Sequence, residues 1–141
     1  MPSIEFGFTN LYPYKCVCTT GSHDTSTIRG WWHEDREQTQ AYYNQILWKQ
    51  GQAPADASGE LCEIIVNNHL ASPAIWTILP LQDWLAMDEK VRKADVDSER
   101  INIPAIPNHY WRYRMHLTLE ELLGESELNG KIARMIRDNR R

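Results

Sequence analysis

Two segments of the 141-residue chain have the composition of β-strands, and their number and spacing limit the folds that the chain can adopt. The first, YKCVCT, covers residues 14–19. The second, AIWTILP, covers residues 74–80 and is typical of a fully buried strand, because it is β-branched and aromatic without polar alternation. Helical patterns separate the two, which favours parallel pairing. Two parallel strands leave both edges open and do not make a stable sheet, so the chain is predicted to be part of a larger α/β fold.

Most of the remaining chain is predicted to be helical. Apolar side chains recur at helical spacing over residues 34–50 and 60–70, a short helix fits LQDWLAM at 81–87, and another helix lies near the end of the sequence. Thr118 and Glu121 have the spacing of a capping box, which marks a helix start. The predicted inward-facing residues are Tyr42, Tyr43, Ile46, Leu47, Leu61, Ile64, Ile65, Leu128, Ile132, Met135 and Ile136.

Two stretches are predicted to lie outside this pattern. Residues 88–100 carry many charges and are expected to be solvated. The segment INIPAIPNHYWRYR, residues 101–114, contains two prolines. A proline inside a helix removes a backbone donor and clashes with the preceding turn, so this segment cannot be a regular helix.

Composition and charge bear on the class of partner. The net charge of −4 argues against nucleic acid, whose phosphates require a cationic surface, and the basic tail KIARMIRDNRR fits cations placed against the negative end of a helix dipole. The longest mostly apolar run, residues 71–81, is too short to span a bilayer, so no membrane partner is expected. Three cysteines and the lack of a signal-peptide pattern in MPSIEFGFTN predict a reduced, cytoplasmic setting. Six Trp and six Tyr against two Phe suit sugars and half-buried grooves.

Each predicted strand is followed at once by a polar pair. His23 and Asp24 follow the first strand, and Gln82 and Asp83 follow the second. In α/β barrels, functional side chains gather at the carboxyl ends of the strands. The alternatives are structural: Asp24 could accept hydrogen bonds from the backbone amides of residues 26–27, and the Gln82–Asp83 pair could cap the start of a helix.

The proline-containing segment offers a second group of candidates. Asn102, Trp111 and Arg112 bring an amide, an aromatic face and a guanidinium to an extended backbone. Such a combination could line a sugar groove. The alternative is a structural loop whose arginine pairs with a carboxylate.

Other chemistries are weakly represented. Cys16, Cys18 and His23 are close in sequence, but their spacing is not a standard zinc pattern, and alternate residues of a strand point to opposite faces. The chain contains neither a nucleophile-elbow motif nor a phosphate-binding glycine loop. Metal-dependent and serine-hydrolase chemistry are therefore not favoured.

Three motifs together resemble a known family. TTGSHDTSTIRGWW, LASPAIWTILPLQDWL and RINIPAIPNHYWRYRMHLTLEELL follow one another in the order typical of the 4-α-glucanotransferases of glycoside hydrolase family 77, the amylomaltases or disproportionating enzymes. The resemblance extends from about Tyr12 to the end. It implies a (β/α)8 barrel that transfers α-1,4-glucan segments between maltodextrins with retention, and it implies no metal or organic cofactor.

The resemblance also implies how this chain relates to that barrel. Residues 1–141 would be a C-terminal part of one catalytic domain without an internal boundary, with the last two strands of the barrel. As an isolated chain it would be helix-rich. Its partners would be a maltooligosaccharide substrate and the remainder of the barrel.

The family motif Thr-Gly-Thr-His-Asp occurs here as residues 20–24, with serine in the third place. By this resemblance Asp24 is the transition-state stabiliser, and His23, Gln82, Asp83, Asn102, Trp111 and Arg112 are candidate substrate contacts. Bacterial members continue with Asn-Asp-Thr, whereas Thr25-Ser26-Thr27 looks like the branch that includes the plant cytosolic enzyme.

Two further carboxylates are needed for the reaction. Retaining transfer uses a nucleophile and an acid/base carboxyl about 5–5.5 Å apart. In this family both carboxylates lie upstream of the His-Asp motif. In this chain, Glu5 is the one acidic residue among residues 1–11. The chain by itself is therefore expected to be inactive. The alternatives are a glucan-binding or scaffold module without catalysis, and an inactive truncated fragment.

Overall fold

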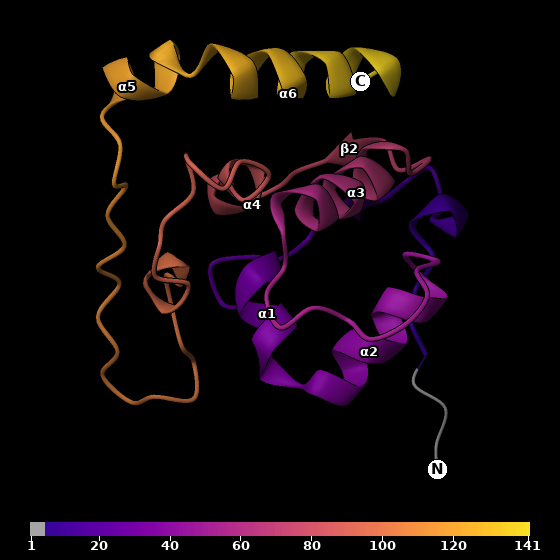
Figure 1. The fold of residues 1–141 in the computed structure, drawn as a ribbon, viewed down its shortest axis with the longest axis horizontal. Helices are drawn as coiled ribbons and strands as arrows, with labels where there is room; N and C mark the ends of the chain where they lie inside the picture. The colour runs from indigo at the N-terminus through magenta and orange to yellow at the C-terminus, as the bar shows by residue number, and fades with distance from the viewer. Residues whose placement is uncertain (1–4) are drawn as a thin grey trace.

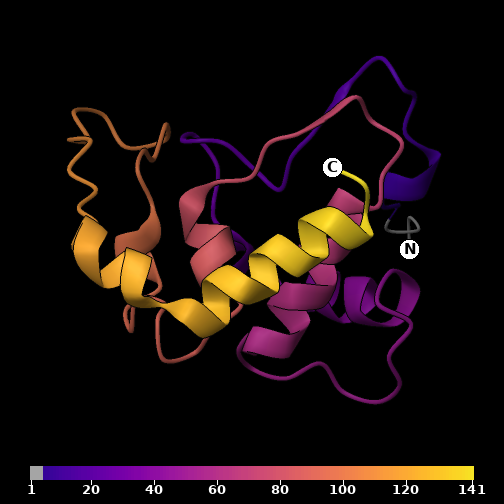
Figure 2. The ribbon, with the colours of Figure 1, turned by 90° about the horizontal axis from the view of Figure 1, so that it is seen from above.

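The structure, a computed structural model, describes residues 5–141. Helices α5 and α6 form a layer along one side of α3 and α4, whereas α1 and α2 lie on the opposite side (Figure 1). Seen from above, α6 crosses over α3 (Figure 2). The elements in chain order are the 3-10 helix η1 (Thr9–Leu11), β1 (Val17–Cys18), α1 (Ile28–Glu34), α2 (Arg36–Gln45), α3 (Gly59–Leu70), β2 (Trp76–Thr77), α4 (Leu81–Leu85), the 3-10 helix η2 (Asp97–Glu99), α5 (Leu119–Gly124) and α6 (Ser126–Asp138).

The two predicted strands are present and pair in parallel, with Val17 opposite Trp76 and Cys18 opposite Thr77. Cys18 is fully buried, whereas Val17 is 47% exposed on the opposite face of the strand. The prediction of a fully buried second strand is wrong, because Trp76 and Ile78 are 62% and 60% exposed. Residues 5–141 cover one face of the strand pair and leave the face that carries these apolar side chains open.

Helix α3 is the centre of the hydrophobic core. Ser58 begins the helix by accepting a hydrogen bond from the Leu61 amide, and one side of the helix is buried from end to end. The α3 side chains pack against residues of α1, α4 and α6. The core includes Ile28, Trp32, Leu61, Cys62, Ile65, Val66, Leu70, Leu85, Leu128 and Met135.

Most of the predicted inward-facing residues lie on the core side of a helix, whereas Ile46 and Leu47 follow the end of α2 and still pack on the core. Leu47, Leu61, Ile65, Leu128 and Met135 are buried. Tyr42, Tyr43, Ile46, Ile64 and Ile132 are partly buried against the core, and Ile136 is partly exposed.

The helix predicted over residues 34–50 is shorter in the structure, where α2 spans Arg36–Gln45 and residues 46–50 are not helical. α1, at Ile28–Glu34, precedes it where no helix was predicted. α1 ends at Glu34, and Asp35 starts α2 by accepting hydrogen bonds from the amides of Glu37 and Gln38. A carboxylate at this position satisfies amides that have no partner within the helix, which favours a new start over a continuous helix.

The prediction of a solvated charged stretch over residues 88–100 is wrong in part. Val91 and Glu99 are buried. The Glu99 carboxylate accepts from Arg29 Nη1 at 2.5 Å and from Thr27 Oγ1 at 2.8 Å. A charge can leave water when it gains a paired charge and hydrogen bonds, as Glu99 does here.

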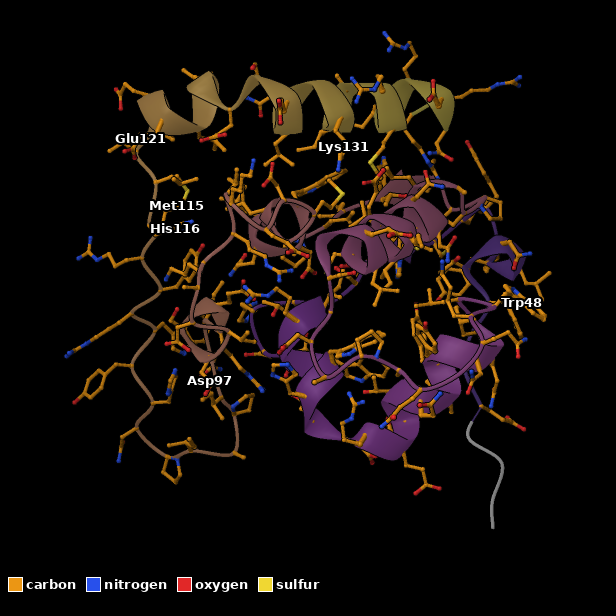
Figure 3. All side chains as sticks on the ribbon, in the orientation of Figure 1. Trp48, Asp97, Met115, His116, Glu121 and Lys131 are labelled. Atoms are coloured by element: carbon orange, nitrogen blue, oxygen red, sulfur yellow. The ribbon has the colours of Figure 1, made fainter. Side chains whose placement is uncertain are left out.

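The capping box and the non-helical proline segment are both confirmed. Thr118 Oγ1 accepts from the Glu121 amide at 3.1 Å, and Glu121 Oε2 accepts from the Thr118 amide at 2.7 Å. Residues 101–114 contain no helix, and the chain runs on through Met115 and His116 to α5, which begins at Leu119 and carries Glu121 in its first turn (Figure 3).

The basic tail is anchored on α3 rather than only at the end of its own helix. Lys131 points from α6 toward α3 and lies 2.7 Å from the Glu63 carboxylate (Figure 3). Arg141 donates to the carbonyls of Leu70, Ser72 and Ala74, at the C-terminal end of α3. These cations meet a carboxylate and a negative helix end. None of the helices within residues 5–141 has the length and apolar character needed to cross a bilayer.

We expect the open face of the strand pair to make the isolated chain self-associate, because exposed apolar strands with unpaired edges pair with one another. Sedimentation velocity should show a sedimentation coefficient that rises with protein concentration. Ile78→Lys, which places a charge on this face, should weaken the association. Leu123→Lys on α5, where the leucine is 80% exposed, is the matched control and should leave it unchanged. Equal weakening by both substitutions would contradict the assignment of the association to the strand face.

Candidate functional site

The loop after β1 is a compact Ser/Thr turn that presents His23 and Asp24. The Ser22 amide donates to Thr25 Oγ1 at 2.8 Å, and the Asp24 amide donates to Ser22 Oγ at 3.2 Å. Gly21 is required by close approach, since a Cβ there would lie 2.6 Å from Thr25 Oγ1. The small hydroxyl residues thus make the turn and leave the His23 and Asp24 side chains about half exposed, at 49% and 48%.

The Asp24 carboxylate is held by a residue that is distant in sequence. Its Oδ1 accepts from Asn102 Nδ2 at 2.7 Å, and its Oδ2 lies 3.3 Å from His23 Nε2. The backbone amide of Asn102 also donates to the backbone carbonyl of His23 at 3.0 Å. Two segments 78 residues apart are thereby joined at the tip of the turn.

The loop-cap alternative for Asp24 is wrong in this structure. The cap of α1 is Thr27, whose Oγ1 accepts from the Gly30 amide at 3.2 Å. Other hydroxyl groups of the loop satisfy its backbone amides, and the Asp24 carboxylate is directed to Asn102 and His23 instead. The carboxylate is therefore available at the protein surface.

Trp111 completes this cluster. Its ring centroid is 4.8 Å from that of His23, with the planes tilted by 44°, and the side chain is 59% exposed. An open aromatic face next to a carboxylate, an amide and an imidazole is suited to a ligand with both apolar and hydroxyl-bearing surfaces, such as a sugar ring. Arg112 lies apart from the cluster, with its guanidinium 4.6 Å from the Tyr110 ring centroid rather than paired with a carboxylate.

Gln82 and Asp83 are both buried, and of the two only Gln82 lines the hollow beside His23. Gln82 Nε2 donates to the Glu99 carbonyl at 2.9 Å. Asp83 Oδ1 accepts from the Ile28 amide at 2.9 Å, and its Oδ2 accepts from the Thr20 hydroxyl. The alternative of a cap on their own helix is also incorrect, because Pro80 precedes α4 and the Asp83 carboxylate meets the first residue of α1. In this structure, their hydrogen bonds hold the loop after β1, the start of α1 and the Glu99 backbone in place.

Burial is the main influence on the Asp83 carboxyl group. Desolvation raises its pKa from 3.8 to about 6, and the nearby Glu99 carboxylate acts in the same direction. The hydrogen bonds from Thr20 and Ile28 oppose this by stabilising the charged form. The group is thus poised to change its protonation near neutral pH.

Hollows border the loop on more than one side. The larger of the two beside His23 and Asp24 has a volume of about 810 Å³ and reaches from Asp24 to helices α1 and α2, and the smaller, of about 400 Å³, lies between His23 and the end of β2. Residues that the sequence analysis did not propose as site residues also line the larger hollow, namely Trp31, Glu34, Tyr42, His69 and Arg100. Arg100 opens the third family-like motif, which was the signal that could have identified it.

The metal-site alternative is not supported. Cys16 Sγ donates to the Pro13 carbonyl at 2.9 Å, and burial raises the pKa of the Cys18 thiol. Within residues 5–141, no three His, Cys, Asp or Glu side chains gather at distances suited to a metal ion.

A parallel strand pair with a polar cluster at its carboxyl end defines an α/β protein whose candidate site lies at the strand ends. Residues 3–119 match the sequence profile of glycoside hydrolase family 77, described as 4-alpha-glucanotransferase. The chain therefore belongs to this family.

Individual relatives agree with this assignment. The 4-alpha-glucanotransferase DPE2 of rice (Oryza sativa subsp. japonica) is 36% identical over 135 residues, which are 96% of this chain and 14% of that protein. The 4-alpha-glucanotransferase of Chlamydia muridarum is 28% identical over 118 residues, which are 83% of this chain and 22% of that protein.

The fold is shared with a solved enzyme structure. Amylomaltase from Streptococcus agalactiae, in complex with acarbose, superposes with a TM-score of 0.66 at 21% identity and covers 92% of this chain. This chain covers 23% of that structure. The described relatives are thus much longer than the chain, which spans between 14% and 23% of their length.

We expect Asp83→Asn to remove a pH dependence of stability. The folded-state pKa of about 6 lies above the ordinary value of 3.8, so the folded state keeps a proton that the unfolded state has lost. The Asp83 contribution to stability is therefore present at low pH and is lost as the pH rises through about 6. Asparagine can still accept from the Ile28 amide. Urea unfolding at about pH 5 and pH 7 should show the wild type losing stability relative to the variant. A difference that does not change with pH would contradict a raised pKa.

Proposed function

We propose that this chain is a segment of a 4-α-glucanotransferase and that it supplies Asp24 as the carboxylate that stabilises the transition state of glucan transfer. The observation that carries the proposal is the contact between Asp24 and Asn102. It joins the first and third family-like motifs at the carboxyl end of a parallel strand. Membership of the family and the shared fold support it.

Asp24 would act by holding sugar hydroxyls. Its half-exposed oxygens can accept from two ring hydroxyls, while Asn102 and His23 fix the orientation of the carboxylate. As the glucosyl ring flattens toward an oxocarbenium ion, these contacts shorten and the negative charge opposes the developing positive charge. Only contacts that strengthen in the transition state accelerate the reaction.

Trp111 would supply the flat surface of the sugar site. Its open ring lies against His23, so a glucosyl unit bound to the His-Asp pair could pack on the indole. The substrate class that fits is an α-1,4-linked maltodextrin, which has an apolar ring face and hydroxyl edges. Arg112, on the Tyr110 ring, would contact a longer chain beyond this unit. No metal or organic cofactor is needed for this chemistry.

The rest of the enzyme would complete both the fold and the chemistry. The chain would be the part of a (β/α)8 barrel that contains its last two strands. Other strands of the barrel would cover the apolar face that carries Val17, Trp76 and Ile78. They would also bring the nucleophile and the acid/base carboxyl, about 5–5.5 Å apart, to Asp24. Buried Cys18 and Cys62 thiols suit a reducing cytoplasm.

We expect the longer polypeptide that contains this chain to convert maltotriose into glucose and longer maltooligosaccharides. The 141-residue chain alone should show no product above a blank, because Asp24 lacks its two partner carboxylates. Chromatography of the oligosaccharides measures both. Transfer by the chain alone would refute the division of the site between segments. Binding of maltooligosaccharides by a longer polypeptide without transfer would favour a glucan-binding module instead.

We expect Asp24→Asn in the longer polypeptide to lower turnover by at least about 10²–10³-fold, as removal of one preorganised transition-state contact does. Binding of substrate should change much less. The matched control is Asp56→Asn, which alters another exposed aspartate that lies 2.7 Å from a histidine, His33. If Asp24 were only structural, the variant would lose about 1 kcal/mol of stability and keep its turnover per folded molecule. Turnover and melting temperature on the same sample separate the two cases.

A further inference from the structure

A single arginine ties together the two segments that meet at the site. Arg100 Nε donates to the Asn102 carbonyl at 2.9 Å, and its Nη1 donates to Ser26 Oγ at 2.8 Å. Its Nη2 lies 3.4 Å from the Asp24 carbonyl. The guanidinium therefore contacts the backbone of both residues whose side chains form the 2.7 Å contact between carboxylate and amide.

Arg100 is also contacted by the last residue of α1, on the side away from Asn102. Glu34, the last residue of that helix, accepts a hydrogen bond from the Ser26 hydroxyl and lies 3.5 Å from Arg100 Nη1. The Arg100 side chain is 28% exposed, so it is neither free in solvent nor part of the core. The carboxylate and the hydroxyl hold the guanidinium plane in one orientation.

The backbone of Arg100 is fixed by the preceding residue. Glu99 is 2% exposed, and its carboxylate is paired with Arg29 at 2.5 Å. Its carbonyl accepts from the buried Gln82 side chain at 2.9 Å. Arg100 therefore projects from a rigid base toward the loop.

The geometry requires arginine in particular. Three nitrogens of one planar group donate in three directions, to acceptors on two segments. A lysine ammonium is a compact point charge on a flexible stem and cannot span these acceptors together. Lysine would keep the positive charge but lose the simultaneous hydrogen bonds to the two segments.

We propose that Arg100 is a positioning residue for glucan transfer, which acts through Asn102 by setting its placement against the Asp24 carboxylate. This inference rests on the proposed function. When the tie is lost, the Asp24 carboxylate is no longer held in the orientation that the transition state requires. A displacement of about 1 Å in a catalytic group can cost about 10²-fold in rate.

The test uses Arg100→Lys in the longer polypeptide that contains this chain. We expect kcat to fall by about tenfold to a hundredfold, while KM changes by less than about threefold, because the loss affects the transition state more than substrate binding. Arg36→Lys is the matched control, since Arg36 also ties loop carbonyls, at 2.9 Å to Pro54 and 2.8 Å to Ala53, away from the site. Its kcat should be unchanged.

A second variant changes the carboxylate that lies beside the Arg100 guanidinium. Glu34→Gln removes a charge that orients Arg100 but touches neither Asp24 nor Asn102, so we expect a smaller loss of kcat in the same direction. Unchanged kcat in Arg100→Lys, or a loss that only follows the fraction of folded protein, would overturn the proposal.

A readout independent of catalysis distinguishes this inference from the proposed function. In the nitrogen-15 spectrum of the 141-residue chain, the side-chain amide of Asn102 should shift in Arg100→Lys and stay in place in Arg36→Lys. If the longer polypeptide transfers no glucan but this resonance shifts, the proposed function is wrong, whereas the claim that Arg100 positions Asn102 is supported. If transfer is normal and the resonance does not move, the tie is refuted.

Discussion

The buried ion pair between Arg29 and Glu99 is the interaction on which the arrangement of the site depends. Both side chains are almost completely removed from water, and such charges are tolerated only when they are paired and hydrogen-bonded. Thr27 donates to the same carboxylate, so the start of α1 is attached to the segment that leads to Asn102. Asn102, three residues after Glu99, is thereby brought to the His23 carbonyl and the Asp24 carboxylate.

The parallel strand pair is the second constraint. Because β1 and β2 run in the same direction, the residues that follow them lie at the same end of the pair. One of these loops remains at the surface and presents His23 and Asp24, whereas the other turns directly into α4 and buries Asp83 beneath it. The same strand order thus yields one exposed carboxylate and one internal one, with the pKa of Asp83 raised by desolvation.

The loop after β1 divides its residues between structure and chemistry. The hydroxyl groups of Ser22, Thr25 and Thr27 satisfy backbone amides of the turn and of α1. His23 and Asp24 are therefore relieved of a capping role, and their polar atoms face Asn102, Trp111 and solvent. This division explains why a stretch so rich in small hydroxyl residues carries one His-Asp pair.

The sequence by itself determined the features that depend on neighbours along the chain. The two strands, the capping box at Thr118 and the lack of helix in residues 101–114 follow from local sterics and hydrogen bonding, and the position of His23 and Asp24 after a strand follows from their order. Tertiary structure decided what depends on distant partners. Asp83 is internal because α1 begins above it, Glu99 is buried because Arg29 meets it 70 residues away, and Arg100 reaches Ser26 across 74 residues. Local pattern cannot reveal such contacts, because the burial of a polar group depends on whether its partner arrives in space.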